Sequence, residues 1–414
     1  MKINQLLPLL LLSFLLSNCD QKKKQNDSVY VSESLPNTIH TTLQPSTKDS
    51  TYSFYVPANH KKNKSSVILL FDAHGDGMLP ITKYKSLADK YDFILMASNQ
   101  SKNGNPLATN LGYAKNLMEN AIDFFHPDSL RIYACGFSGG SRIASALAIY
   151  QGGIHGVIGI GAGFPPLDKP ITHQFDFCGI AGTQDFNLTE MQELENMLNK
   201  SDINHILLTY KGKHEWCKIN EMEKAFQWIR LLEIKNNIIP KDEHFLSGIT
   251  MHYDSLIQKN KLNKDVISTY LATMEYYQMM KGLIPLDNVK QTLINYKKDQ
   301  KIKNYWTRLK DIKSAEVKLK QGYLNALSIK EPNWWKEEII LLRNSKKYPS
   351  DQLEMNERII SYLSLACYMN CTQLISQNQL DEAKHYALLY EIIDPENPEA
   401  KRLNQTLIPK SNHP

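Results

Sequence analysis

Between residues 52 and 230, short unbroken apolar runs alternate with amphipathic stretches, and this alternation restricts the possible folds more than any other feature. Apolar runs without a polar face are typical of strands that are buried on both sides. The amphipathic stretches between them are long enough for the crossover connections that parallel strands require. The pattern predicts an α/β fold, a doubly wound and mostly parallel sheet. Strands are expected at 52–56, 65–71, 93–98, 130–135, 156–163, 177–182 and 203–210, and helices at 80–91, 110–125, 141–150, 188–200 and 221–234.

The strand pattern stops near residue 235, and the apolar positions then recur at helical spacing to the end. A chain of 414 residues is longer than one ordinary domain. We therefore expect the sheet domain at 51–235 and an all-α domain at 236–414. The stretch "NQLDEAKHYALLYEIIDPENPEAKRL" (378–403) resembles the second helix of a tetratricopeptide repeat, with Ala383 at the small-residue position. Only one such unit is visible, so it should pack on the rest of the helical domain.

The N-terminus predicts export. An apolar segment, "LLPLLLLSFLL" (6–16), follows a short positive start and is too short to cross a bilayer as a stable helix. The next residues, "LSNC", resemble a bacterial lipoprotein lipobox, although Asn18 replaces the usual small residue. The resemblance implies a signal peptide at 1–19, acylation of Cys19 with chains such as palmitate, and a polar tether at 20–50. We expect a protein anchored in the bacterial cell envelope, at the outer membrane or periplasmic face; a plain signal peptide cut elsewhere is the alternative.

The composition excludes several classes of function. A net charge of +5, spread over scattered lysines without an arginine-rich stripe, gives no reason to expect a nucleic-acid partner. An apolar content of 42% with 22% charged residues is typical of globular chains. The cysteines beyond Cys19 lack zinc-ligand spacing, so no metal is expected. Export permits disulfides, but an odd number leaves at least one thiol unpaired. These five cysteines are Cys135, Cys178, Cys217, Cys367 and Cys371.

Ser138 is the first candidate for catalysis. It lies in "CGFSGG" (135–140), directly after an apolar strand and before a helical stretch. G-x-S-x-G at such a junction is typical of a nucleophile elbow, where small neighbours let the strand and helix close around a strained serine. The alternative is a serine that serves only the turn.

A serine hydroxyl needs a base beside it, and the base needs an acid to orient it. Asp185 follows one later strand in "GTQDFN", and His214 follows the last strand in "GKHEW". The order serine, acid, histidine is the one that an elbow at this position requires. Asp185 could instead cap the following helix, and His214 could be a surface histidine. Four rivals fit less well because of their positions: Asp176, His155 and His205 at strand starts, and His74 in the turn after the first buried strand.

An oxyanion needs aimed donors. The backbone N–H of Gly139, directly after the serine, is the first expected donor. The second should come from the turn "FDAHGDG" (71–77), and we expect the N–H of Asp76, with Gly75 as the alternative.

Together, "HGDG", "GFSGG", "GTQD" and "GKHEW" resemble the α/β-hydrolase family, in particular its feruloyl-esterase, polyhydroxybutyrate-depolymerase and dienelactone-hydrolase-like members. The resemblance covers about residues 52–230. It implies that Ser138 attacks an ester carbonyl, that His214 accepts the proton, and that Asp185 orients the imidazole, without a metal or organic cofactor. Lys213 departs from the glycine usual before this histidine and could narrow the space beside it.

No long insertion that could form a lid separates the predicted strands. We therefore expect an accessible site for an ester on a bulky carrier, such as an acylated polysaccharide or a polyester. Two alternatives remain: a serine peptidase of the prolyl-oligopeptidase type, and a non-catalytic binding or scaffold lipoprotein whose helical domain holds a protein partner.

Overall fold

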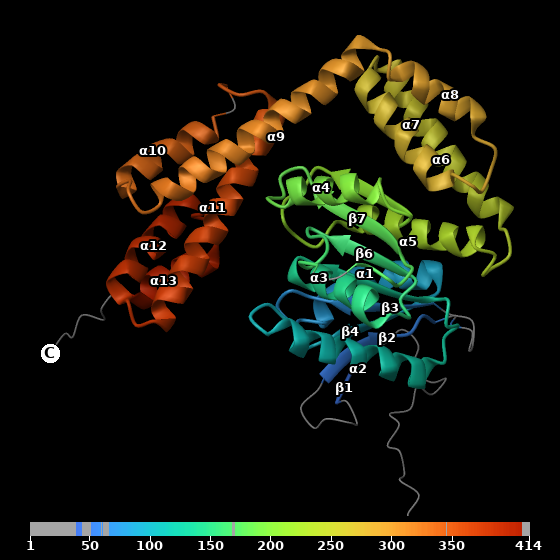
Figure 1. Ribbon diagram of the computed structural model, residues 1–414, viewed down its shortest axis with the longest axis horizontal. Helices are drawn as coiled ribbons and strands as arrows, with labels where there is room; N and C mark the ends of the chain where they lie inside the picture. Colours follow the sequence, from blue (N-terminus) through green and yellow to red (C-terminus); the bar gives the residue numbers. More distant parts are fainter. Residues whose placement is uncertain are drawn as a thin grey trace, which may run out of the picture.

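The computed structural model describes residues 39–43, 51–58, 60, 66–167, 170–344 and 346–407. An eight-stranded sheet lies at its centre, in the order β1-β2-β4-β3-β5-β6-β7-β8 (Figure 1). The pairs β1–β2 and β2–β4 are antiparallel, and every other pair is parallel. The strands are β1 (Ile39–Leu43), β2 (Thr51–Tyr55), β3 (Ser66–Phe71), β4 (Phe93–Ser98), β5 (Ile132–Phe137), β6 (Gly156–Ile160), β7 (Asp176–Gly182) and β8 (His205–Tyr210).

Helices cover both faces of the sheet, which confirms the predicted fold class. Side chains alternate along β3: Ile68 and Leu70 belong to the core that α1 and α5 share with one face of the sheet, while Val67 and Leu69 belong to the core on the opposite face, which includes α2, α3 and α4. All four are buried, as unbroken apolar strands require. The helices are α1 (Met78–Tyr91), α2 (Leu107–Phe125), α3 (Gly139–Ala146) with the π-helical turn η1 (Leu147–Gln151), α4 (Leu188–Leu198) and α5 (Ile219–Lys235).

The chain beyond α5 is helical, as predicted, but its helices belong to separate cores. Leu246 and Tyr253 of α6, with Tyr276 of α7, join the core of the sheet domain. A separate core around Trp335 and Leu363 holds the later helices together. The long α9 leads from the first group to the second (Figure 1). The helices are α6 (Glu243–Leu262), α7 (Val266–Met280), α8 (Asp287–Tyr296), α9 (Gln300–Ala326), α10 (Pro332–Leu342), α11 (Ser350–Ser376), α12 (Leu380–Ile393) and α13 (Pro398–Leu407).

Three sequence predictions can be compared with this arrangement only in part. Residues 39–43 fall inside the expected tether, yet they form edge strand β1, paired with β2. The predicted signal peptide, including Cys19, lies outside the described residues. The tetratricopeptide-like stretch corresponds to α12 and α13, with Ala383 fully buried. Among the helices described, none combines the length and apolarity needed to cross a membrane.

Candidate active site

Ser138 lies at the junction of β5 and α3 in a strained conformation. Its φ of 54° and ψ of −119° are unusual for a residue with a side chain. The turn tolerates only small neighbours, because a Cβ on Gly136 would overlap the backbone of Gly140. A Cβ on Gly140 would in turn overlap the carbonyl of Phe71, at the end of β3. The glycines around Ser138 therefore serve the close approach of strand and helix that the sequence predicted.

The structure brings Ser138, His214 and Asp185 together from three separate loops. Ser138 Oγ lies 2.9 Å from His214 Nε2, and His214 Nδ1 lies 2.9 Å from Asp185 Oδ1. An ionised carboxylate can only accept hydrogen bonds, so Nδ1 carries the proton and Nε2 is free to accept from the serine hydroxyl. This is the tautomer that a general base for Ser138 needs.

Asp185 and His214 are fixed by their surroundings. Asp185 is 1% exposed, and the N–H of Asn187 donates to its Oδ1 at 2.8 Å. The imidazole packs between two rings, with centroid distances of 4.1 Å to Phe186 and 4.7 Å to Phe137. Because the acid is hydrogen-bonded and the imidazole is packed, the His214 ring has little freedom to move away from Ser138.

The turn after β3 lies beside Ser138 but presents a different donor from the one predicted. The N–H of Asp76 donates to Asp72 Oδ2 at 3.3 Å, and that of Gly75 donates to the Asp72 carbonyl, also at 3.3 Å. Both are therefore engaged within the turn. The N–H of Ala73 has no hydrogen-bond acceptor among the described residues.

Strand register relates Ala73 to Ser138. β3 and β5 are parallel neighbours whose last paired residues are Phe71 and Gly136, so Ala73 and Ser138 each follow two residues later at the same edge of the sheet. Gly139, the other predicted donor, opens α3, and its N–H likewise has no acceptor in the described part of the chain. The first N–H groups of a helix have no partner within the helix and suit an anion. Asn103 lies directly over Gly139, where a Cβ would overlap its side-chain oxygen.

Asp72 organises this turn, and the sequence analysis did not identify it. It is 1% exposed and accepts a hydrogen bond from the N–H of His74 at 2.7 Å. It also accepts one from Trp216 Nε1 at 2.8 Å. The His74 side chain is 81% exposed, with Nδ1 3.6 Å from Asp72 Oδ2. The signal available in the sequence was an acidic residue directly after a mostly apolar strand, where a buried carboxylate must be paired or hydrogen-bonded.

The rival acid and bases lie elsewhere. Asp176 begins β7, His155 precedes β6, and His205 begins β8, so all three are at the amino ends of strands, while Ser138 follows a carboxyl end. Burial raises the pKa of Asp176 and lowers that of His155. The five cysteines in the described part of the chain are buried free thiols. No group of three or more His, Cys, Asp or Glu side chains in that part could hold a metal ion.

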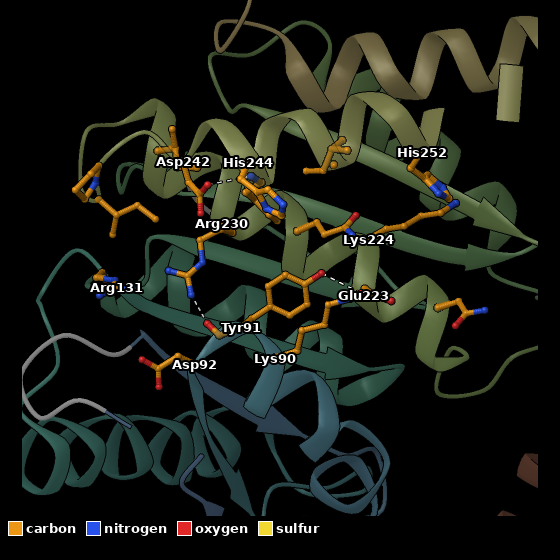
Figure 2. A pocket seen from close by; sticks show the side chains of 18 residues that line it. Lys90, Tyr91, Asp92, Arg131, Glu223, Lys224, Arg230, Asp242, His244 and His252 are labelled. Carbon is orange, nitrogen blue, oxygen red and sulfur yellow. Dashed lines mark hydrogen bonds and ion pairs between the residues drawn. The ribbon is translucent and has the colours of Figure 1, made fainter. Parts of the chain in front are cut away.

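A groove of about 980 Å³ lies away from Ser138, between the end of α1, α5 and α6 (Figure 2). Its charged groups are engaged with one another: Tyr91 donates to Glu223 at 3.0 Å, and Lys90 pairs with the same carboxylate. Arg230 is paired with Glu233 at 2.7 Å. These charges are therefore neutralised by neighbouring side chains.

Comparison with known proteins gives structural matches only. No protein-family model matches the chain, and no match is found among curated proteins. The chain is similar to an S-formylglutathione hydrolase of Staphylococcus aureus, at 12% identity and a TM-score of 0.40, over 46% of this chain and 95% of that one. It is also similar to an esterase of Pyrobaculum calidifontis, at 10% identity and a TM-score of 0.41, over 48% of this chain and 87% of that one. Esterase 2 of Thermogutta terrifontis matches at 12% identity and a TM-score of 0.40, over 50% of this chain and 98% of that one. Likeness at this level assigns no activity to the chain.

Proposed function

We propose that the protein is a serine hydrolase that cleaves carboxylic esters, with Ser138, His214 and Asp185 as its catalytic residues. One observation carries the proposal: a strained serine, an imidazole and a buried carboxylate form a continuous hydrogen-bonded chain with 2.9 Å at each step. A serine with only a structural role in the turn would not require a hydrogen-bonded histidine and aspartate beside it.

The reaction follows from this chain of hydrogen bonds. Ser138 Oγ attacks the ester carbonyl carbon while its proton passes to His214 Nε2. The tetrahedral intermediate collapses, the C–O bond to the alcohol breaks, and His214 returns the proton to the departing oxygen. Water then attacks the acyl-enzyme and gives a proton to His214. The second collapse breaks the bond to Ser138 Oγ, which takes this proton from His214, and releases the carboxylic acid. Both steps use only groups of the chain and water.

The oxyanion is bound by two backbone donors in this proposal, the N–H groups of Gly139 and Ala73. Their support is that each lacks another acceptor within the described residues, and that Ala73 and Ser138 each follow the paired residues Phe71 and Gly136 by two positions. One such donor is typically worth about 10²–10³ in kcat. Asp72 contributes by holding the turn that carries Ala73.

We propose an ester on a bulky carrier, such as an acylated polysaccharide, as the natural substrate, with the enzyme anchored to the cell envelope through Cys19. The sequence supports the anchor through its apolar leader and "LSNC". It supports the substrate because the connections between strands of the sheet domain contain no long insertion.

The test uses the chain from Asp20 onward and its Ser138→Ala variant. Both are treated with a fluorophosphonate probe and assayed on short p-nitrophenyl esters and methyl ferulate. We expect labelling and turnover in the parent and neither in the variant. A well-folded parent that neither labels nor turns over would contradict the proposal and direct attention to the helical region as a binding module.

A further inference from the structure

The loop that carries Asp185 is held by cations from the helical region. Arg358 of α11 donates from Nη1 to the carbonyl of Thr183 at 2.6 Å. Lys320 of α9 donates from Nζ to the carbonyl of Phe186 at 3.1 Å. The two carbonyls lie on either side of Asp185 in the chain, so the acid sits in a segment fixed at both ends from a distant part of the sequence.

Arg358 is itself fixed by a buried carboxylate. Its Nε and Nη2 donate to Glu316 Oε2 at 2.8 and 2.6 Å, and the two residues are 5% and 1% exposed. Lys320 pairs with the other oxygen of Glu316 at 2.8 Å. Buried charges cost desolvation and are weak evidence for stability, but a planar guanidinium between a carboxylate and a carbonyl has one geometry. The cluster therefore sets the position of the loop closely.

This restraint reaches the base as well as the acid. The carbonyl of Phe186 is held by Lys320, while its ring packs on His214 at 4.1 Å. Lys213, beside the histidine, extends toward Glu357 of α11, with 3.9 Å between Nζ and Oε2. Lys213 is 62% exposed, so this last pair is weak. Lys213 points to the helical region, not into the space beside the imidazole.

A second contact supports the docking of these helices. α9 passes beside α4 (Figure 1), where Lys313 pairs with Glu193 at 3.0 Å. The loops after β7 and β8, which carry Asp185 and His214, therefore contact α9 and α11.

We propose that Arg358 and Lys320 are positioning residues for the Asp185–His214 pair, which makes the helical region a component of the active site. This inference rests on the proposed hydrolase function. It predicts that loosening the loop lowers kcat without changing the affinity for a small ester, because the cations touch the loop and not the reacting atoms.

The experiment compares two double variants of the full chain. Arg358→Met with Glu316→Gln removes the contact with Thr183 and neutralises both Arg358 and its carboxylate partner. Lys320 loses its ion pair with Glu316 but keeps the Phe186 carbonyl as an acceptor. Arg308→Met with Asp351→Asn is the matched control, because Arg308 and Asp351 also join α9 to α11, through an exposed ion pair. Each is assayed for kcat and KM on p-nitrophenyl acetate, for the rate of fluorophosphonate labelling, and for the downfield proton resonance of the His214 ring N–H that faces Asp185.

We expect kcat to fall about 10- to 100-fold in the Arg358–Glu316 variant, with KM within about twofold, because misplacing a catalytic group by an ångström costs up to that much. The His214 resonance should shift or broaden, and the control should match the parent. Arg358→Lys, which keeps the positive charge but not the planar guanidinium, should lose less kcat. Lys320→Met should also lower kcat.

Three results would overturn the proposal: parent-like kcat in the Arg358–Glu316 variant, an equal loss in the control, or an unchanged His214 resonance. If the parent itself neither labels nor turns over, the proposed hydrolase function fails. The resonance would still report whether the helices position His214 against Asp185, so the two failures are separate.

Discussion

Trp216 Nε1 donates a hydrogen bond to Asp72 Oδ1 at 2.8 Å, which joins the loop after His214 to the turn that carries Ala73. The indole is packed at the same time against Tyr84 and Phe137, with centroids 5.9 and 5.8 Å away. One buried carboxylate therefore connects the two loops that, in the proposed mechanism, carry the base and an oxyanion donor.

Asp72→Asn should lower kcat/KM roughly tenfold or more on short p-nitrophenyl esters. The amide nitrogen cannot accept from the N–H of His74, so the turn loses one of its anchors, and residues that orient catalytic groups typically matter by 10- to 100-fold. Asp89→Asn is the control, because Asp89 also accepts a side-chain hydrogen bond, from Tyr55 at 2.8 Å, away from the site. Equal activity in both variants would show that Asp72 does not position the turn.

Gly161→Ala should damage the site directly. Gly161 has a φ of +64°, and a Cβ there would lie 2.9 Å from Asp185 Oδ2 and 3.1 Å from His214 Nδ1. We expect kcat to fall about 10²-fold as the pair is pushed apart. Gly153→Ala is the matched control, because its φ of +75° imposes similar backbone strain but its Cβ would meet only Met118 Sδ, at 3.9 Å. If both variants lose the same activity, backbone strain and not the contact is responsible.

Glu233→Ala should separate stability from activity. Glu233 is fully buried at the amino ends of the strands, where it accepts from Arg131 at 3.0 Å and from Arg230 at 2.7 Å. Removing it leaves the buried guanidinium of Arg131 without its carboxylate, which costs about 3–5 kcal/mol of unfolding free energy. Urea unfolding measures the loss, with Glu243→Ala, whose carboxylate is 74% exposed, expected to change stability by less than about 0.5 kcal/mol. Below the unfolding transition, kcat of Glu233→Ala should stay near that of the parent.

The five cysteines of the described part should not react with Ellman's reagent in the native protein. Burial raises the pKa of Cys217 and of Cys367 to about 12, and the pKa of Cys135 lies well above its usual range for the same reason. The thiolate is the reactive form, so little of it exists near neutral pH. In the chain from Asp20 onward, five thiols should titrate only after denaturation. Rapid reaction in the folded protein would mean that one of them is accessible.

Much of the fold was predictable from the sequence because strands and helices are indicated by the pattern of apolar residues within each segment. The strand Phe93–Ser98 was predicted to the residue, since six consecutive apolar or small positions exclude a half-exposed element. β1 was missed: "IHTTL" is short and half polar, and only its pairing with β2 makes it a strand. An edge strand of this kind carries no apolar run that could identify it.

For the candidate site, the sequence by itself determined Ser138, Asp185 and His214, because each follows a strong strand signal and their order matches the elbow. It also determined the α/β class. Only the tertiary structure decided that Ala73 and not Asp76 presents an unengaged N–H, that Asp72 binds Trp216, and that Arg358 holds the loop of Asp185. Those contacts join residues 144 and 175 positions apart. The first hydrogen bond depends on the packing within the sheet domain and the second on how the helices dock against it, and no local pattern encodes either.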